Sequence, residues 1–300
     1  MNAGAQELVG AAPLAAAPAG SLDPWPTLRV VADDGVEELM FLHEGVGPRE
    51  WTRPRAAVLI IPTIDAPARA YVTLAAALAK AGFHVARAEL RGQGYSSAPL
   101  STSSGYGELV ERAIPAMVAS LRRRWGKLPI YLLGHGAGGQ LACLFAARGG
   151  FEVEGLIVVG CSGGDPWRER IAKFGRALLP SQPRARLLDW ARAGRRLCGS
   201  ERDWERALAR VRLPILSLAL AEDRESPRAS VEALLARMPR ARCEQVTVGG
   251  RQATHHGWLE RPGMVVEQVC RWQRRPRNRT GPRVCIAREL LPQAAGFSGL

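Results

Sequence analysis

Short apolar runs alternate with helical segments along the middle of this 300-residue chain, and that alternation constrains the fold more than any other feature. Continuous apolar strands are typical of a sheet that is buried on both faces, and intervening helices predict mostly parallel pairing. The turn signal at residues 33–35 (Asp-Asp-Gly) predicts a hairpin, so the sheet should begin antiparallel. The predicted strands are residues 28–32, 38–43, 57–62, 84–90, 130–134, 155–160, 215–221 and 244–248. The predicted helices are residues 68–81, 106–125, 137–148, 228–238 and 264–273.

One long connection interrupts this alternation. Residues 165–212 contain thirteen Arg or Lys and six Asp or Glu, a net charge of +7, and they read as two or three helices. A connection of this length usually has its own function, and we expect a basic helical cap over the carboxyl edge of the sheet. Its charge indicates either an anionic ligand or only a solvated helical surface.

The remaining segments are the two ends of the chain. Residues 1–26 are rich in Ala and Pro and lack the basic start of a signal peptide, so we predict a disordered leader. Residues 27–273 should form the folded domain, and residues 274–300 a basic tail.

The net charge of +13 comes almost entirely from arginine. Arginine-rich codon usage and a selected basic surface both explain it, and the absence of a groove-reading motif predicts no nucleic-acid partner. Six scattered cysteines without a Cys-x-x-Cys pair indicate free thiols in a reducing compartment. The reducing compartment predicts a cytoplasmic location, and no apolar stretch approaches the ~20 residues of a membrane span.

The most specific local pattern surrounds Gly136. The apolar run 130–134 leads into the turn Gly134-His135-Gly136-Ala137-Gly138, and a helix rich in small residues follows. This strand–turn–helix layout exposes the serine in G-x-S-x-G hydrolases, but its middle residue here is glycine. Glycine suits a strained turn, and it has no atom that can attack a substrate.

Two further stretches complete a recognisable set. The first follows the fourth strand and reads Glu89-Leu90-Arg91-Gly92-Gln93-Gly94-Tyr95-Ser96. The second has two parts, Glu222-Asp223 at the end of a strand and the later run Thr254-His255-His256-Gly257-Trp258. From about residue 28 to 273, the chain resembles the α/β-hydrolase superfamily, in particular its serine-aminopeptidase and monoacylglycerol-lipase-like branch. The resemblance implies an α/β-hydrolase fold, with a mostly parallel eight-stranded sheet flanked by helices and a helical cap insertion.

The resemblance also implies site residues in the order nucleophile, acid, histidine. Gly136 occupies the nucleophile position, Asp223 that of the acid, and His255 that of the base, with His256 as the alternative base. A carboxylate at the end of an apolar strand needs a partner, which favours a histidine, although Asp223 could instead cap the helix that follows. The Ser-His-Asp triad is therefore incomplete, and enzymatic activity stays open.

The predicted oxyanion loop also departs from the superfamily pattern. Members usually have His-Gly after the third strand, whereas this chain has Pro62-Thr63-Ile64-Asp65. The N–H of Thr63 or Ile64 is expected to act with that of Ala137, and His135 should line the same pocket. Asp65 either opposes an oxyanion or points away and caps the next helix.

The chain offers few other candidates for a nucleophile or a metal ligand. Ser162 lies in the string Gly160-Cys161-Ser162-Gly163-Gly164, but no small-residue helix follows it, so we interpret it as a loop residue. Cys161 either borders the pocket or packs inertly. The five histidines form no metal motif and no phosphate loop is present, so no metal or other cofactor is predicted.

Three functional hypotheses follow from these residues. The first is a lipase-like pseudoenzyme that binds a small, lipid-like or acyl ligand under the basic cap. The second is a cofactor-free lyase, isomerase or cyclase that uses Asp223 and His255 as a general base. The third is an esterase or lipase-like hydrolase with a displaced nucleophile. The sequence leaves the ligand and the oligomeric state open.

Overall fold

The computed structural model describes residues 24–46, 54–96, 106–150, 152–163, 206–274 and 288–290. The predicted leader lies almost entirely outside these ranges. Residues 165–205 of the predicted cap also lie outside them, so the cap stays a prediction.

A nine-stranded sheet forms the centre of the described molecule. The eight predicted strands are all present, with ends shifted by no more than two residues. The ninth is a short strand in the predicted tail, which the sequence analysis did not foresee. The strands are β1 (Thr27–Val31), β2 (Glu37–His43), β3 (Ala56–Ile61), β4 (Phe83–Glu89), β5 (Ile130–His135), β6 (Gly155–Val159), β7 (Pro214–Leu220), β8 (Arg242–Val248) and β9 (Arg288–Leu290).

The strand order is β1-β2-β4-β3-β5-β6-β7-β8-β9. β1 and β2 form the predicted antiparallel hairpin and β2 pairs antiparallel with β4, whereas all pairs from β4 to β9 are parallel. β3 is buried at every position, as its continuous apolar sequence requires of a central parallel strand.

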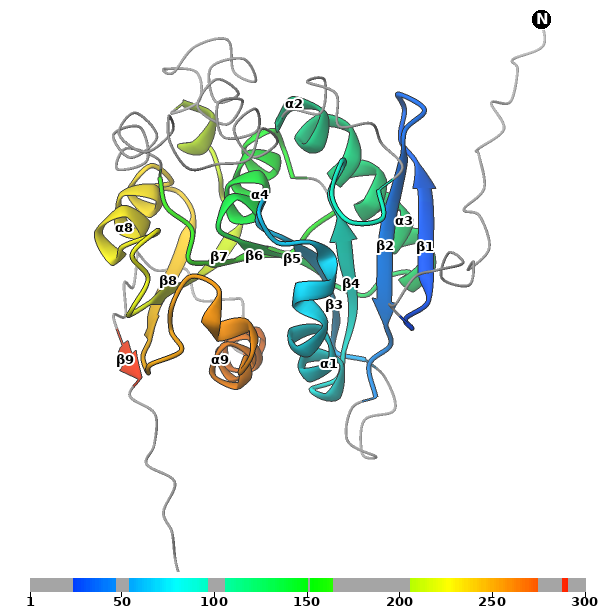
Figure 1. Ribbon diagram of the computed structural model, residues 1–300. Helices are drawn as coiled ribbons and strands as arrows, with labels where there is room; N and C mark the ends of the chain where they lie inside the picture. Colours follow the sequence, from blue (N-terminus) through cyan, green and yellow to red (C-terminus); the bar gives the residue numbers. More distant parts are fainter. Residues whose placement is uncertain are drawn as a thin grey trace, which may run out of the picture.

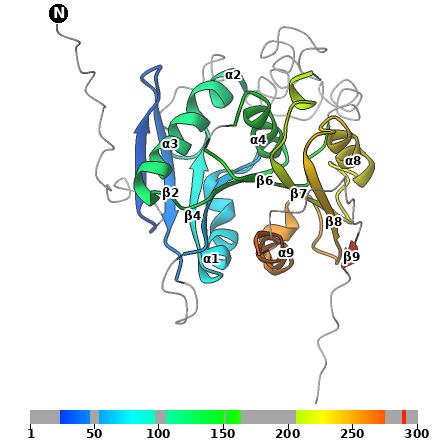
Figure 2. The same cartoon turned by 180° about the vertical axis from the view of Figure 1, so that it is seen from behind.

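Helices cover both faces of this sheet (Figures 1 and 2). α1 and α9 pack on one face, whereas α3, α4 and α8 pack on the other, and each face has its own apolar cluster. None of the helices in the described ranges is long and apolar enough to cross a membrane. The α-helices are α1 (Val72–Lys80), the short α2 (Tyr106–Glu108), α3 (Ile114–Trp125), α4 (Ala137–Ala147), α8 (Arg228–Ala236) and α9 (Gly263–Gln273).

One predicted helix is broken in the structure. The segment 106–125 contains a π-helical stretch at Leu109–Ala113 between α2 and α3. Pro115 lies in the first turn of α3, and a proline has no N–H for the regular helical hydrogen bond. The π-helical stretch therefore lies where a continuous α-helix would lack one backbone N–H donor, that of Pro115.

The parallel strands all end at one edge of the sheet, and this edge gathers the predicted site. In the strand register, Ile61 lies opposite Gly134, His135 opposite Val159, and Val159 opposite Leu218. The loops that follow β3, β5, β6, β7 and β8 therefore emerge side by side. Residues separated by nearly two hundred positions in sequence become neighbours there.

The turn after β4 is held by the carboxylate of Glu89. Its oxygens accept hydrogen bonds from the N–H groups of Ala68 and Tyr95. Gly94 lies against this carboxylate at a φ of +43°, so a side chain there would collide with it. The amide of Gln93 donates to the carbonyl oxygen of Ile64. This turn therefore supports the predicted oxyanion loop rather than contributing chemistry itself.

Candidate functional site

Gly136 lies in a sharp turn between β5 and α4. Its φ is +52° and its ψ is −117°, a conformation that side-chain-bearing residues rarely adopt. Its N–H donates to the carbonyl oxygen of Val159 at 2.9 Å, which ties the turn to β6. Gly138 lies against the carbonyl oxygens of Ile61 and Pro62, where a Cβ would collide. The small residues after β5 therefore let the backbone of α4 approach β3.

Asp223 and His255 form a buried pair beside this turn. Nδ1 of His255 lies 2.8 Å from Oδ2 of Asp223. The other oxygen of Asp223 accepts hydrogen bonds from the N–H groups of Glu225 and Ser226, each at 2.8 Å. The carboxylate thus has partners on both oxygens, as a buried charge requires. It bonds to the loop that precedes α8 and pairs with His255 at the same time.

Gly160 makes room for this pair. Its φ is +52°, and a Cβ on it would lie 2.8 Å from Oδ2 of Asp223 and 3.4 Å from Nδ1 of His255. The glycine that the sequence analysis considered part of an alternative serine motif therefore supports the acid and the histidine. Any larger residue would push into their hydrogen bond.

His255 faces Gly136 with its second nitrogen. A Cβ on Gly136 would lie 3.0 Å from Nε2 of His255 and 2.9 Å from Oγ1 of Thr63. Such distances are shorter than almost all real Cβ contacts. Nε2 of His255 thus points at the predicted nucleophile position, where the space for a side chain is narrow.

The predicted oxyanion loop has an internal partner for one of its N–H groups. Thr63 N–H donates to the hydroxyl of Tyr71 at 2.9 Å, and that hydroxyl pairs with Nδ1 of His135 at 2.8 Å. All three residues are buried, and burial raises the pKa of Tyr71, so its hydroxyl stays neutral. Of the predicted donors, Thr63 is therefore engaged. Ala137, the first residue of α4, has no carbonyl within its helix to receive its N–H.

His135 is a buried, uncharged imidazole. Burial, followed by the charges of His255 and His256, lowers the pKa of His135 well below its usual range. Its ring centroid lies 4.7 Å from that of His255 and 5.6 Å from that of His256. His135 is therefore neutral, and its ring packs against the rings of these two histidines.

Asp65 pairs with the second histidine and does not cap a helix. Its Oδ2 lies 3.0 Å from Nε2 of His256, and both side chains are about half exposed. Burial alone would raise the pKa of Asp65, but His256 and a hydrogen bond from Thr63 lower it to about 2. The hydrogen bond with Asp65 raises the pKa of His256. An ionised carboxylate thus lies next to the oxyanion loop.

The alternative nucleophiles are placed unfavourably. Ser162 is buried, and its carbonyl oxygen accepts a hydrogen bond from the amide of Gln140. Cys161 is fully buried, and burial raises the pKa of its thiol well above the usual range. A thiol in this state is not a nucleophile.

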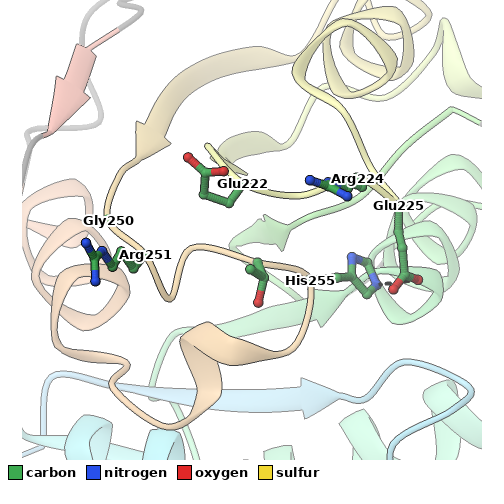
Figure 3. A pocket seen from close by; sticks show the side chains of 7 residues that line it. Glu222, Arg224, Glu225, Gly250, Arg251 and His255 are labelled. Carbon is green, nitrogen blue, oxygen red and sulfur yellow. Dashed lines mark ion pairs between the residues drawn. The ribbon is translucent and has the colours of Figure 1, made fainter.

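An open pocket of about 610 Å³ borders His255. Loops after β7 and β8 form its walls, and Figure 3 shows Glu225 beside the imidazole of His255, with Arg251 on the opposite side. Oε2 of Glu225 lies 3.9 Å from Nε2 of His255. Glu225 is not among the residues predicted from the sequence, although its place two residues after Asp223 at a strand end was a usable signal. The lining residues are Glu222, Arg224, Glu225, Gly250, Arg251, Thr254 and His255.

Comparisons with known proteins identify the architecture. Est1E from Butyrivibrio proteoclasticus, solved with ferulic acid bound, is similar with a TM-score of 0.61 and 19% identity over 81% of this chain and 96% of its own. A malate-bound thermophilic esterase from Thermogutta terrifontis has a TM-score of 0.57 and 19% identity, covering 83% and 98% of the two chains. The chain has the α/β-hydrolase fold.

Two further comparisons agree with this α/β-hydrolase fold. A hydrolase from Pseudomonas aeruginosa PA01 has a TM-score of 0.57 and 21% identity over 82% of this chain and 98% of its own. The family described as serine aminopeptidase, S33, matches residues 52–188. No curated protein sequence matches the chain. The fold prediction is thereby confirmed, whereas the catalytic roles of individual residues stay predictions.

Proposed function

We propose that this α/β-hydrolase-fold protein lacks serine-hydrolase activity and binds a small or acyl ligand at the carboxyl edge of its sheet. The observation that carries the proposal is Gly136, which lies at the nucleophile turn with His255 facing it. Loss of the nucleophile removes roughly 10⁶-fold of rate in a serine hydrolase.

The loop after β3 supports the same proposal. Thr63 N–H is bonded to Tyr71, and ionised Asp65 lies next to it. An oxyanion is stabilised by preorganised donors and is opposed by nearby negative charge. The site therefore disfavours a tetrahedral acyl intermediate even if another nucleophile were supplied.

The ligand class follows from the pocket walls. Two glutamates and two arginines line the described part of the pocket, together with His255. Charged side chains around a concave site favour a ligand with polar or charged groups over a bare alkyl chain. The basic segment 165–212 would add positive charge above it if the predicted cap forms.

Turnover of short-chain p-nitrophenyl esters tests this proposal. We expect hydrolysis by the wild type to equal that of His255→Ala, since neither contains an attacking serine. Ester turnover that is lost in His255→Ala would overturn the proposal. His84→Ala, a strand histidine remote from the pocket lining, is the matched control.

The assembled acid–histidine pair favours a second candidate function, general-base catalysis without an acyl-enzyme. Asp223 orients His255, whose Nε2 faces the space at Gly136. A positioned base contributes about 10²–10⁴-fold and needs no serine. The test is deuterium incorporation from solvent into carbonyl compounds, with loss expected in both His255→Ala and Asp223→Asn. Incorporation that is unchanged in both variants would rule this candidate out.

A further inference from the structure

Three side chains with metal-binding atoms meet at the edge of the pocket. Glu225, His255 and His256 each offer one ligand atom, and these atoms lie within 4.8 Å of one another. Glu225 comes from the loop after β7 and the two histidines from the loop after β8. The sequence gives no His-x-His or similar spacing, so only the folded chain brings the set together.

Each histidine is held by its own carboxylate. Nδ1 of His255 bonds to Asp223 at 2.8 Å, and Nε2 of His256 bonds to Asp65 at 3.0 Å. Histidines that bind metals almost always use one nitrogen for the metal and the other for a carboxylate or carbonyl, which fixes the ring and raises its basicity. Both rings of this cluster have that partner.

We propose that Glu225, His255 and His256 bind a divalent transition-metal ion, with Zn²⁺ as the first candidate. Two imidazole nitrogens and one carboxylate oxygen form a donor set that zinc accepts, and three protein ligands leave a position open. Because Glu225 and His255 line the pocket, the ion would lie in its wall. Asp223 and Asp65 act here as positioning residues.

Two of the candidate ligand atoms need to move only slightly closer together to bind one zinc ion. Nε2 of His255 and Oε2 of Glu225 lie 3.9 Å apart, whereas two ligands of a tetrahedral zinc ion are about 3.4 Å apart. Glu225 is partly exposed, with 42% of its side chain accessible, so its carboxylate can move toward His255. The buried imidazole keeps its place through Asp223.

This metal site goes beyond the proposed function and competes with one part of it. Nε2 of His255 cannot bind a metal ion and accept a proton from a substrate at the same time. A direct binding measurement separates the two ideas. Failure of metal binding leaves the absence of serine-hydrolase activity untouched, and ester turnover by the wild type leaves metal binding untouched.

The experiment is a titration of the full-length, tag-free protein with Zn²⁺ against a chromophoric chelator. We expect one ion per chain, at least about 100-fold weaker binding in Glu225→Gln and His256→Ala, and about 10- to 100-fold weaker binding in Asp65→Asn. Glu222→Gln is the matched control, because Glu222 lines the same pocket outside the cluster. Thermal unfolding of every variant verifies that the fold is intact.

Cobalt spectra distinguish this site from the thiols. Co²⁺ held by nitrogen and oxygen ligands absorbs weakly in the visible region, and thiolate ligands add an intense near-ultraviolet band. We expect only the weak bands, and we expect them to disappear in His256→Ala. No saturable binding, unchanged affinity in both ligand variants, or a thiolate band that survives them would each overturn the proposal.

Discussion

The two halves of the candidate site differ in how far they keep the arrangement of an acyl-transfer enzyme. At the ends of β7 and β8, Asp223 and His255 form a fully bonded pair that Gly160 accommodates. At the ends of β3 and β5, Gly136 has no side chain and Thr63 N–H is bonded to Tyr71. The acid–histidine half therefore contains both predicted residues in a hydrogen bond, whereas the predicted nucleophile–oxyanion half departs from the superfamily pattern at two points.

This difference indicates that the two halves can change separately. The acid–histidine pair depends on hydrogen bonds within its own loops, so loss of a serine hydroxyl removes none of them. The turn at Gly136 depends on backbone conformation and on close approach of α4 to β3. It therefore keeps its shape without a nucleophile.

Gly138→Ala should have the largest effect, because it tests that backbone approach. A Cβ there collides with the carbonyl oxygens of Ile61 and Pro62, and overpacking against backbone costs about 3 kcal/mol. Gly263→Ala is the control, since a Cβ at this helical glycine has open space. Urea unfolding measures both. Equal stability of the two variants would show that the turn does not depend on close packing.

Asp223→Ala should have the next largest effect and should damage only the acid–histidine half. It leaves His255 and the N–H groups of Glu225 and Ser226 without their partner, at a cost of about 2 kcal/mol. Asp33→Ala serves as the control, because Asp33 is exposed and forms a surface ion pair with Arg112 worth about 0.5 kcal/mol. Chemical denaturation should separate the two variants clearly.

Gly136→Ser tests whether a serine hydroxyl is the only group that the predicted nucleophile–oxyanion half lacks. Gly126→Ser is a close control, because Gly126 has a φ of +60° and a ψ of −127° and a Cβ on it meets open space. Both variants incur backbone strain of about 1–3 kcal/mol. The free energy of unfolding should fall by roughly 1 kcal/mol more in Gly136→Ser than in Gly126→Ser, because the new Cβ is crowded by Thr63 and His255.

The same variant has a catalytic readout. We expect no gain of esterase activity in Gly136→Ser. Thr63 N–H is already bonded to Tyr71, and the negative charge of Asp65 opposes an oxyanion. A gain of esterase activity that disappears in the double variant Gly136→Ser, His255→Ala would show that the predicted nucleophile–oxyanion half needs only a serine. That result would contradict the second alteration inferred in the oxyanion loop.

The pair of Asp65 and His256 should produce the smallest effect, a change of stability with pH. The raised pKa of His256 contributes stability that is full below its unfolded value of about 6.5 and is lost as pH rises through the folded value. The lowered pKa of Asp65 contributes stability that is lost as pH falls from about 4 toward 2. A half-exposed pair is worth less than about 1 kcal/mol.

Unfolding free energies at pH 5 and pH 9 measure this effect. His256→Asn should lower stability more at pH 5 than at pH 9. A variant that destabilises equally at both values would show that the ion pair does not form. His84→Asn is a control of opposite sign, because burial lowers the pKa of His84 and this variant should lower stability less at pH 5 than at pH 9.

Much of the fold was predictable because local patterns dominate it. β3 is a continuous apolar run and β5 is one up to Gly134, and every position of both is buried. The turn at Gly136 was predictable as well, because a glycine between an apolar strand and a small-residue helix has few other uses. The strand β9 was not, because its pairing depends on β8, which lies forty residues earlier in the chain.

The interactions within the site were predictable only in part. The order of Gly136, Asp223 and His255 indicated which positions would meet, but adjacent histidines have no sequence signal that assigns their partners. The structure pairs Asp223 with His255 and Asp65 with His256. The engagement of Thr63 N–H by Tyr71 depends on a helix that begins after the loop, so no spacing rule revealed it.

Fluorophosphonate labelling tests the central claim most directly, because the probe forms a stable adduct with an activated serine. The wild-type protein, mapped by peptide mass spectrometry, should carry no adduct at any serine, including Ser162. An adduct on one serine that disappears in His255→Ala would show that the acid–histidine pair still activates a nucleophile. That result would contradict the proposal that this protein lacks serine-hydrolase activity.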